Sequence, residues 1–407
     1  MSANPEPPAL LIQHLPDRET VSAGIWLTRG SAHESDDVAG ATHLVEHLTL
    51  RRCGGRDRRS LAAAVDRLGG DVDAWTGSEL MGVSLTTTTD ALGEGLALLV
   101  DAITRPSFEA EDVELERRVI LAELELLRDD PTELVEEALL DAAWDGHPLA
   151  RPVIGTADGV AALEIPTLVE HHRHLVQPGQ VVVSVAGDVD GLDRDACLAA
   201  LDLSHPPVPV PLPDLEWRAG RRCVVRSWAD QVHCRLAFEA IPSSDDRLAT
   251  ISVLNRALGV GASSRLFQRL REDEGLTYDI WSALALRRPG GLLEIGWACS
   301  PVANPRVWDL VLAEIGRVTR DLDSDEIDIA REGLLRGLRM DSDLPVARCA
   351  MDVAEVLDRG RRFDLEVVRS ELEAVTVDQV RALADEILRP DRMAAAVCGP
   401  EGAELPG

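Results

Sequence analysis

Two periodicities of hydrophobic residues alternate along this chain. Residues 21–27 and 82–88 follow the period of two that is typical of β-strands. A period of three to four residues predicts amphipathic helices over residues 92–103, 111–127 and 134–144. A further strand at 72–75 is separated from 82–88 by a short turn containing Gly and Ser, so the two are expected to pair. We therefore predict an α+β fold with mostly antiparallel sheets and helices packed on one side of each.

The chain is expected to consist of two related halves joined by a Pro-rich segment. Asp73 and Trp75 recur 206 residues later as Asp279 and Trp281. Other matches recur at slightly larger offsets, as expected when a duplicated chain gains loop insertions. Chance matching in a chain rich in Ala and Leu is the alternative explanation. The predicted boundaries are an N-terminal domain at 1–203, a linker at 204–217 and a C-terminal domain at 218–407.

The charge and cysteine content narrow the possible partners and location. The chain of 407 residues has 41 basic and 71 acidic side chains, giving a formal charge of −30, and every basic residue is arginine. This balance argues against binding to nucleic acid or to an anionic membrane. Its origin stays open between codon bias, salt adaptation and substrate choice. The seven cysteines form no C-x-x-C pair, and no apolar run is long enough to span a bilayer, so we expect a cytoplasmic protein.

The strongest chemical signal is the motif His43-Leu-Val-Glu46-His47. Residues four apart share one face of a helix, so His43 and His47 can bind one metal ion. Glu46 lies on nearly the same face and can act as a general base on a metal-bound water without being a ligand. Chance spacing is the alternative, but a chain with only ten histidines rarely produces this motif by chance.

A catalytic zinc ion normally takes a third protein ligand. The predicted helix at 111–127 offers Glu116 and Glu123, two turns apart on one face in an apolar setting. A carboxylate on such a face needs a partner. From spacing alone, both residues could equally be solvated members of an acidic helix.

At this point the sequence resembles a known family, the inverzincin metallopeptidases of the pitrilysin, insulinase and mitochondrial processing peptidase type. The resemblance rests on the motif HLVEH, on LGGDVDAWT at 68–76 and on ERRVILAE at 116–123, and it is closest to the smaller two-domain bacterial branch. It implies that His43, His47 and Glu123 bind one zinc ion per chain and that Glu46 activates a zinc-bound water. It further implies that Glu116 orients a ligand histidine. The two halves would then face each other across a chamber.

The resemblance also assigns roles to the strand beside the zinc and to the second half. A peptide substrate would add as a strand to the edge formed by Ala74, Trp75 and Thr76. Asp73 stands where the family usually has Asn, which suggests a preference for basic substrates or simply a solvated carboxylate. The second half lacks the metal ligands but carries the last two predicted site residues, Arg271 and Tyr278. In the family the Tyr hydroxyl stabilises the oxyanion and the Arg helps hold the substrate. Tyr278 is the only tyrosine in the chain.

These features together predict a zinc-dependent endopeptidase that cleaves unfolded or short peptides, including as a processing peptidase. Because one chain carries both the zinc set and the Arg/Tyr pair, we expect a self-sufficient homodimer. The alternatives are the zinc-bearing subunit of an obligate heterodimer that matures peptides, and a non-catalytic core subunit of the same fold.

Overall fold

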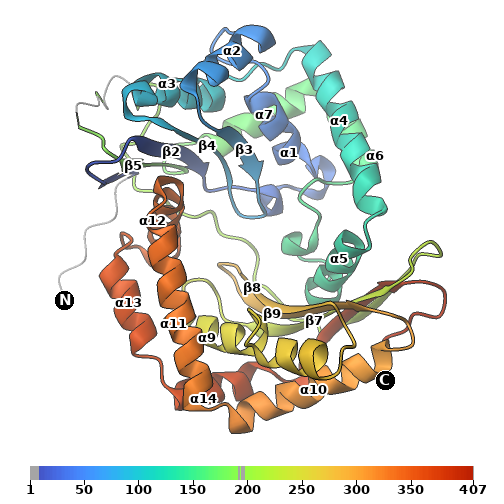
Figure 1. The fold of residues 1–407 in the computed structure, drawn as a ribbon. Helices are drawn as coiled ribbons and strands as arrows, with labels where there is room; N and C mark the ends of the chain where they lie inside the picture. Colours follow the sequence, from blue (N-terminus) through green and yellow to red (C-terminus); the bar gives the residue numbers. More distant parts are fainter. Residues whose placement is uncertain (1–8, 191–192, 194–197, 407) are drawn as a thin grey trace. The chain divides into compact units, whose positions relative to one another are not determined.

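The computed structural model describes residues 9–190, 193 and 198–406, and these form two compact units. Each unit is assembled from three separate stretches of chain. The first unit contains the described residues up to Glu125 together with Pro152–Leu212 and Met340–Phe363. The second contains Leu126–Arg151, Pro213–Arg339 and the described residues from Asp364 onward. The two five-stranded sheets with their helices confirm the predicted α+β class (Figure 1).

The first unit is built on a sheet with the order β1-β5-β2-β4-β3. Only β1 and β5 pair in parallel, and the other neighbours are antiparallel. The strands are β1 (Leu10–His14), β2 (Thr20–Leu27), β3 (Val72–Thr76), β4 (Met81–Thr88) and β5 (Val181–Gly187). Because β3 is at the edge of this sheet, its outer side has no neighbouring strand among the described residues.

Most helices of this unit pack on one face of its sheet, as predicted. Val21 and Ile25 of β2 belong to the same core as Leu96 and Leu99 of helix α3 (Leu92–Thr104). Helix α3 contacts β2 and β4 (Figure 1). The helices are α1 (Ala41–Thr49), α2 (Arg58–Leu68), α3 (Leu92–Thr104), α4 (Ala110–Arg128), α6 (Ala157–Ala162), α7 (Ile165–Leu175) and α12 (Pro345–Arg359). The last residues of α4 belong to the second unit.

The opposite face of this sheet is also covered by a helix, α12. The prediction that helices pack on one side of the sheet is therefore incomplete for this unit. Alternate residues of the strands, such as Trp26 and Val182, pack against Cys349 and Val353 of α12. Successive residues of a strand point to opposite faces of the sheet, and in β2 and β5 the residues on both faces are buried and mostly apolar. Each face therefore needs a cover that excludes water. Residues far along the chain supply the second cover.

The second unit repeats this plan with the sheet order β6-β10-β7-β9-β8. Its strands are β6 (Arg221–Val225), β7 (Val232–Ala240), β8 (Asp279–Leu286), β9 (Gly291–Cys299) and β10 (Ala394–Gly399). Its helices are α5 (Pro131–Trp144), α9 (Leu248–Gly259), a π-helix at Phe267–Asp273, α10 (Asn304–Asp321), α11 (Ser324–Asp341), α13 (Leu365–Glu373) and α14 (Val377–Ile387). Helix α11 ends in the first unit, and α5 contacts β10, β6 and β7.

The two sheets share a local feature that accounts for the repeated tryptophans. Trp75 on β3 lies across from Gly82 on β4, and a Cβ atom at Gly82 would be 2.8 Å from the Trp75 ring. In the second sheet, a Cβ atom at Gly296 would collide with the ring of Trp281 in the same way. The glycine in each pair leaves room for the indole to lie flat on the neighbouring strand. This match and the common strand order support an internal duplication.

The Pro-rich segment is held against the first unit at Val208. The amide of Val208 donates to the carbonyl of Gly179 at 2.9 Å, and the Thr28 hydroxyl donates to the carbonyl of Val208 at 3.1 Å. The chain passes to the second unit between Leu212 and Pro213. Among the described residues, no helix has the length and apolar character needed to cross a membrane.

Candidate metal centre

Helix α1 presents the motif residues on one face and buries the other. Leu44, Val45 and Leu48 are fully buried and anchor the helix on the sheet. The helix starts after Gly40, whose φ of 96° lies in the left-handed region that glycine adopts without strain. His43, Glu46 and His47 therefore occupy the half-buried side that faces away from the core.

The start of α1 is fixed by a residue that the sequence pattern did not single out. The buried carboxylate of Glu34 accepts hydrogen bonds from the amides of Gly40 at 2.8 Å and Thr42 at 2.6 Å. These amides lack partners within the helix, and a negative charge at a helix N-terminus is favourable. Glu34 thus sets the position from which His43 follows one residue later.

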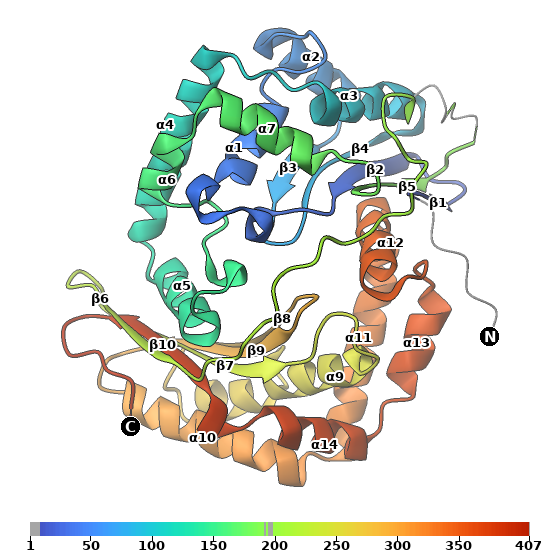
Figure 2. The same ribbon diagram turned by 180° about the vertical axis from the view of Figure 1, so that it is seen from behind.

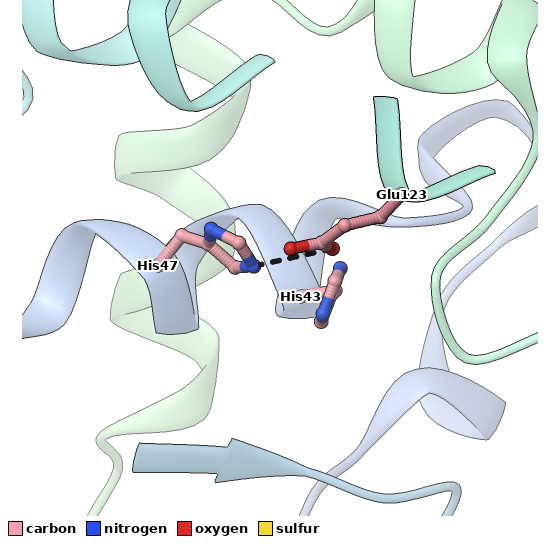
Figure 3. A group of neighbouring side chains, drawn as sticks. All are labelled: His43, His47 and Glu123. Atoms are coloured by element: carbon pink, nitrogen blue, oxygen red, sulfur yellow. Dashed lines mark ion pairs between the residues drawn. The ribbon is translucent and has the colours of Figure 1, made fainter. Parts of the chain in front are cut away.

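The three predicted ligands converge, as Figure 3 shows. His43 and His47 extend from α1 and Glu123 extends from α4, and their ligand atoms all lie within 4.8 Å of one another. Nε2 of His47 is 3.7 Å from Oε2 of Glu123. Two imidazole nitrogens and one carboxylate oxygen are a donor set that suits zinc.

The state of the His43 ring also suits a metal. Burial, together with the neighbouring His47, lowers the pKa of His43 to about 4, so its ring is neutral at neutral pH and can bind a cation. Its buried Nδ1 has no hydrogen-bond partner among the described residues. A buried imidazole nitrogen without a partner and two other ligand groups beside it fit a metal ion.

Glu116 accepts a hydrogen bond from His47 and so fixes the orientation of its ring. Its Oε2 lies 3.1 Å from Nδ1 of His47, and a carboxylate can only accept, so Nδ1 carries the proton and Nε2 is left for a metal. Its Oε1 lies 3.0 Å from Nη1 of Arg51. Arg51 in turn donates from Nε to Asp112 at 3.2 Å, and Arg52 donates to the same carboxylate at 2.7 Å.

Sequence reasoning missed Arg51 and Asp112 as supports of the site. The available signal was the pair Arg51 and Arg52 shortly after α1, together with the acidic residues Glu111 and Asp112 one turn before Glu116. Such a signal is weak because it does not reveal which charges meet.

Glu46 lies beside the three ligand residues without being one of them. Burial raises the pKa of Glu46 to about 7, partly offset by His47 and reinforced by the charges of Asp73 and Glu123. Its Oε2 is 3.8 Å from Nε2 of His43 and accepts a long hydrogen bond of 3.5 Å from the hydroxyl of Thr76. A carboxyl group with a pKa near neutrality can both take and return a proton.

The contact with Thr76 brings the edge strand β3 next to the metal centre. Ala74, Trp75 and Thr76 are all half-buried on this strand, and Asp73 at its beginning is exposed. The free side of β3 is therefore available beside Glu46.

Arg271 and Tyr278 lie together in the second unit. The Arg271 guanidinium is 4.7 Å from the ring centroid of Tyr278 and also 4.7 Å from that of Phe267. The side chain of Tyr278 is largely exposed, with 82% of its surface accessible. Contact between Arg271 and Tyr278 is thus a feature of this unit, and their role in catalysis stays a prediction.

The histidines of α7 have structural partners. Nε2 of His171 is 2.9 Å from the hydroxyl of Thr42 on α1, and Nε2 of His172 is 2.8 Å from the carbonyl of Ile103. Helices α7 and α1 contact each other and lie side by side in both views (Figures 1 and 2). His171 therefore supports the metal helix at the residue before His43.

Comparison with known families agrees with the fold. The family described as insulinase, peptidase family M16, matches residues 9–157, which include the three ligand residues and Glu46. The family described as the peptidase M16 inactive domain matches residues 163–334. The fold and the site define the class as a zinc peptidase built from two related α+β units. More specifically, the chain belongs to peptidase family M16, the insulinase family.

Individual relatives cover nearly the whole chain. An uncharacterized zinc protease of Mycobacterium leprae is 32% identical over 402 residues, covering 96% of this chain and 89% of the relative. The β subunit of the mitochondrial processing peptidase of Caenorhabditis elegans is 23% identical, covering 93% and 85%. Among solved structures, a protease from Helicobacter pylori has a TM-score of 0.88 at 16% identity, covering 97% of this chain and 98% of that chain. That last likeness establishes the fold alone.

Proposed function

We propose that this zinc peptidase is an endopeptidase that cleaves unfolded or short peptides and that Glu46 is its general base. The observation that carries the proposal is the position of Glu46, next to three convergent ligand residues but outside their set. A chain that had kept the fold and lost the chemistry would have no reason to retain this arrangement. The proposal therefore stands against the alternative of a non-catalytic core subunit.

His43, His47 and Glu123 would hold the zinc ion, with Glu116 fixing the tautomer and direction of His47. When bound, zinc supplies a positive charge that polarises the scissile carbonyl and the attacking water. Glu46 takes a proton from that water and returns it to the leaving amine. Its raised pKa makes both transfers feasible near neutral pH.

The substrate would bind as an added strand on the free edge of β3. Backbone groups of Ala74 to Thr76 would pair with the peptide, which explains how sequences with different side chains can bind. The exposed carboxylate of Asp73 at the start of this strand would favour a basic side chain in the peptide. Strand addition requires an extended segment, so unfolded or short chains are the expected substrates.

The second unit would contribute Arg271 and Tyr278. The Tyr hydroxyl can donate a hydrogen bond to the oxygen on which negative charge develops, and Arg271 is stacked on the Tyr ring and would limit its motion. Since both sets of residues are in one chain, the protein would act as a homodimer without a sister subunit.

The test is a cleavage screen on a peptide library by mass spectrometry, with zinc content measured on the same samples. Glu46→Gln should retain one zinc ion per chain and lose cleavage, whereas Glu123→Gln should lose zinc as well. Glu125→Gln, on the same helix, is the matched control and should change neither. Cleavage by Glu46→Gln, or no stoichiometric zinc in the unmodified protein, would refute the mechanism.

A heterodimeric enzyme is the second candidate, because one relative is the β subunit of a mitochondrial processing peptidase. In that case the purified chain would hold zinc but remain inactive alone. Activity that appears only after addition of a sister chain, with a change in mass by light scattering, would replace the homodimer proposal.

A further inference from the structure

Five arginines line one hollow on the first unit. Arg51 and Arg52 follow α1, Arg58 and Arg59 begin α2, and Arg118 lies on α4. The hollow has a volume of about 340 Å³. Arg51 and Asp112 of its lining also support the metal centre through Glu116, and the other lining residues have no part in the proposed peptidase chemistry.

The charge of this hollow is the reverse of that of the whole chain. The chain has 71 acidic residues against 41 arginines, whereas the hollow has three acidic residues, Asp57, Glu111 and Asp112, against five arginines. Asp112 is buried and already bonded to Arg51 and Arg52. Asp57 caps α2 by accepting from the amide of Ser60 at 2.8 Å. Two of the three acidic groups are thus engaged within the protein.

Three of the arginines remain available. Arg58, Arg59 and Arg118 form no ion pair with any residue that the structure describes, and Arg118 only donates from Nε to the carbonyl of Glu114. Each guanidinium presents a fork of donors that matches phosphate oxygens. At 0.15 M salt the Debye length is about 8 Å, so the remaining negative charge of the chain is largely screened from a ligand inside the hollow.

We propose that this hollow, Arg51–Arg52–Arg58–Arg59–Arg118, binds a compact oligophosphate anion of pyrophosphate type. Two linked phosphate groups can engage several guanidinium forks at once, which a single carboxylate cannot do. The volume accommodates a pyrophosphate group with its neighbouring water. Binding itself does not depend on the proposed peptidase function.

Occupancy of the hollow should also reach the metal centre. Arg51 lines the hollow and lies 3.0 Å from Glu116, which in turn holds His47 at 3.1 Å. An anion at Arg51 neutralises the charge that draws electron density from Glu116. The carboxylate then acts more strongly on His47, so a bound cation is held more tightly. The site is therefore a regulatory one, and this part rests on the zinc set of the proposed function.

The binding test is calorimetric titration of the zinc-loaded full chain with pyrophosphate at low and moderate salt. The triple variant Arg58→Gln, Arg59→Gln, Arg118→Gln should bind about tenfold more weakly or worse, since each change removes a charge-assisted contact. The matched control is Arg173→Gln, Arg306→Gln, Arg336→Gln, which removes three exposed charges elsewhere and should bind like the unmodified protein. Glu111→Gln removes an acidic group from the hollow and should tighten binding a few-fold.

The outcomes separate the possibilities. No saturable binding to the unmodified protein, or equal weakening in both triple variants, would overturn the proposal. Equal affinity for citrate would overturn its phosphate selectivity.

Coupling to the metal is measured as the rate of zinc transfer to a chromogenic chelator. With pyrophosphate present, zinc should leave the unmodified protein more slowly than it leaves the hollow variant, and the rates should agree without pyrophosphate. The unmodified protein and the hollow variant have the same metal ligands. Direct extraction of zinc by pyrophosphate is therefore equal in both and does not affect the comparison. Equal rates with pyrophosphate would refute the coupling, and lack of peptide cleavage would leave the binding result intact.

Discussion

The contact between Glu116 and His47 gives the sharpest quantitative prediction. Glu116→Gln replaces the carboxylate 3.1 Å from Nδ1 of His47 with a neutral amide of nearly the same shape. A hydrogen bond to a charged group contributes roughly 1.5–3 kcal/mol. Arg51, 3.0 Å from the same carboxylate, already shares its charge, so we expect the lower part of that range. A loss of about 1.5–2 kcal/mol corresponds to roughly twelve- to thirtyfold weaker zinc affinity, in line with other supporting partners of metal ligands.

The assay is competition for zinc between the protein and a chelator of known affinity. The fold should survive the change, because Arg51 keeps its contact with Asp112 and the amide still fills the space. The control is Glu114→Gln, on the same helix with its side chain largely exposed, which should leave zinc affinity unchanged. If Glu116→Gln alters zinc affinity less than threefold in a folded protein, the idea that this carboxylate holds His47 for the metal is wrong.

Three further predictions address other parts of the molecule. Tyr278→Phe should lower kcat about a hundredfold with little change in KM, as expected for loss of one oxyanion donor, and equal kinetics would remove this role. Asp73→Asn should reduce the ratio of cleavage rates for matched Arg-rich and Glu-rich peptides, and an unchanged ratio would exclude the charge effect. Burial lowers the pKa of His171 to about 4, so between pH 6.5 and 4 the unfolded chain takes up a proton there and the folded protein does not. The free energy of unfolding should therefore fall over that range by up to about 3 kcal/mol from this group. Urea unfolding should show a smaller fall for His171→Gln, whereas the control His205→Gln, at an exposed position, should show the full fall.

The fold could be predicted in its elements more fully than in its assembly. Periodicity located β4 and α4 to within one or two residues, because their hydrophobic faces are regular. It could not predict that α12 covers the sheet of the first unit and α5 that of the second. A helix with one apolar face fits any apolar sheet surface, so the choice depends on tertiary packing.

The site shows the same division. The spacing of His43 and His47 indicates a metal because both residues lie on one short helix, where geometry follows from sequence. Glu123 needed the family resemblance, since spacing alone left it undecided. Asp112 was missed because it contacts Arg51 through a fold that brings distant segments together. Glu34 lies only 8 residues before Thr42, but its contact depends on the conformation of the loop between them, which periodicity does not predict.

The covering of the first sheet by α12 constrains how the protein can be made. During synthesis, the strands of that sheet leave the ribosome long before residues 345–359, and until then the sheet face that carries Trp26 and Val182 lacks its helix cover. An apolar sheet surface in a nascent chain attracts chaperones and other chains. A fragment ending at the Pro-rich segment should consequently aggregate when expressed alone and become soluble when the remaining half is supplied from a second message.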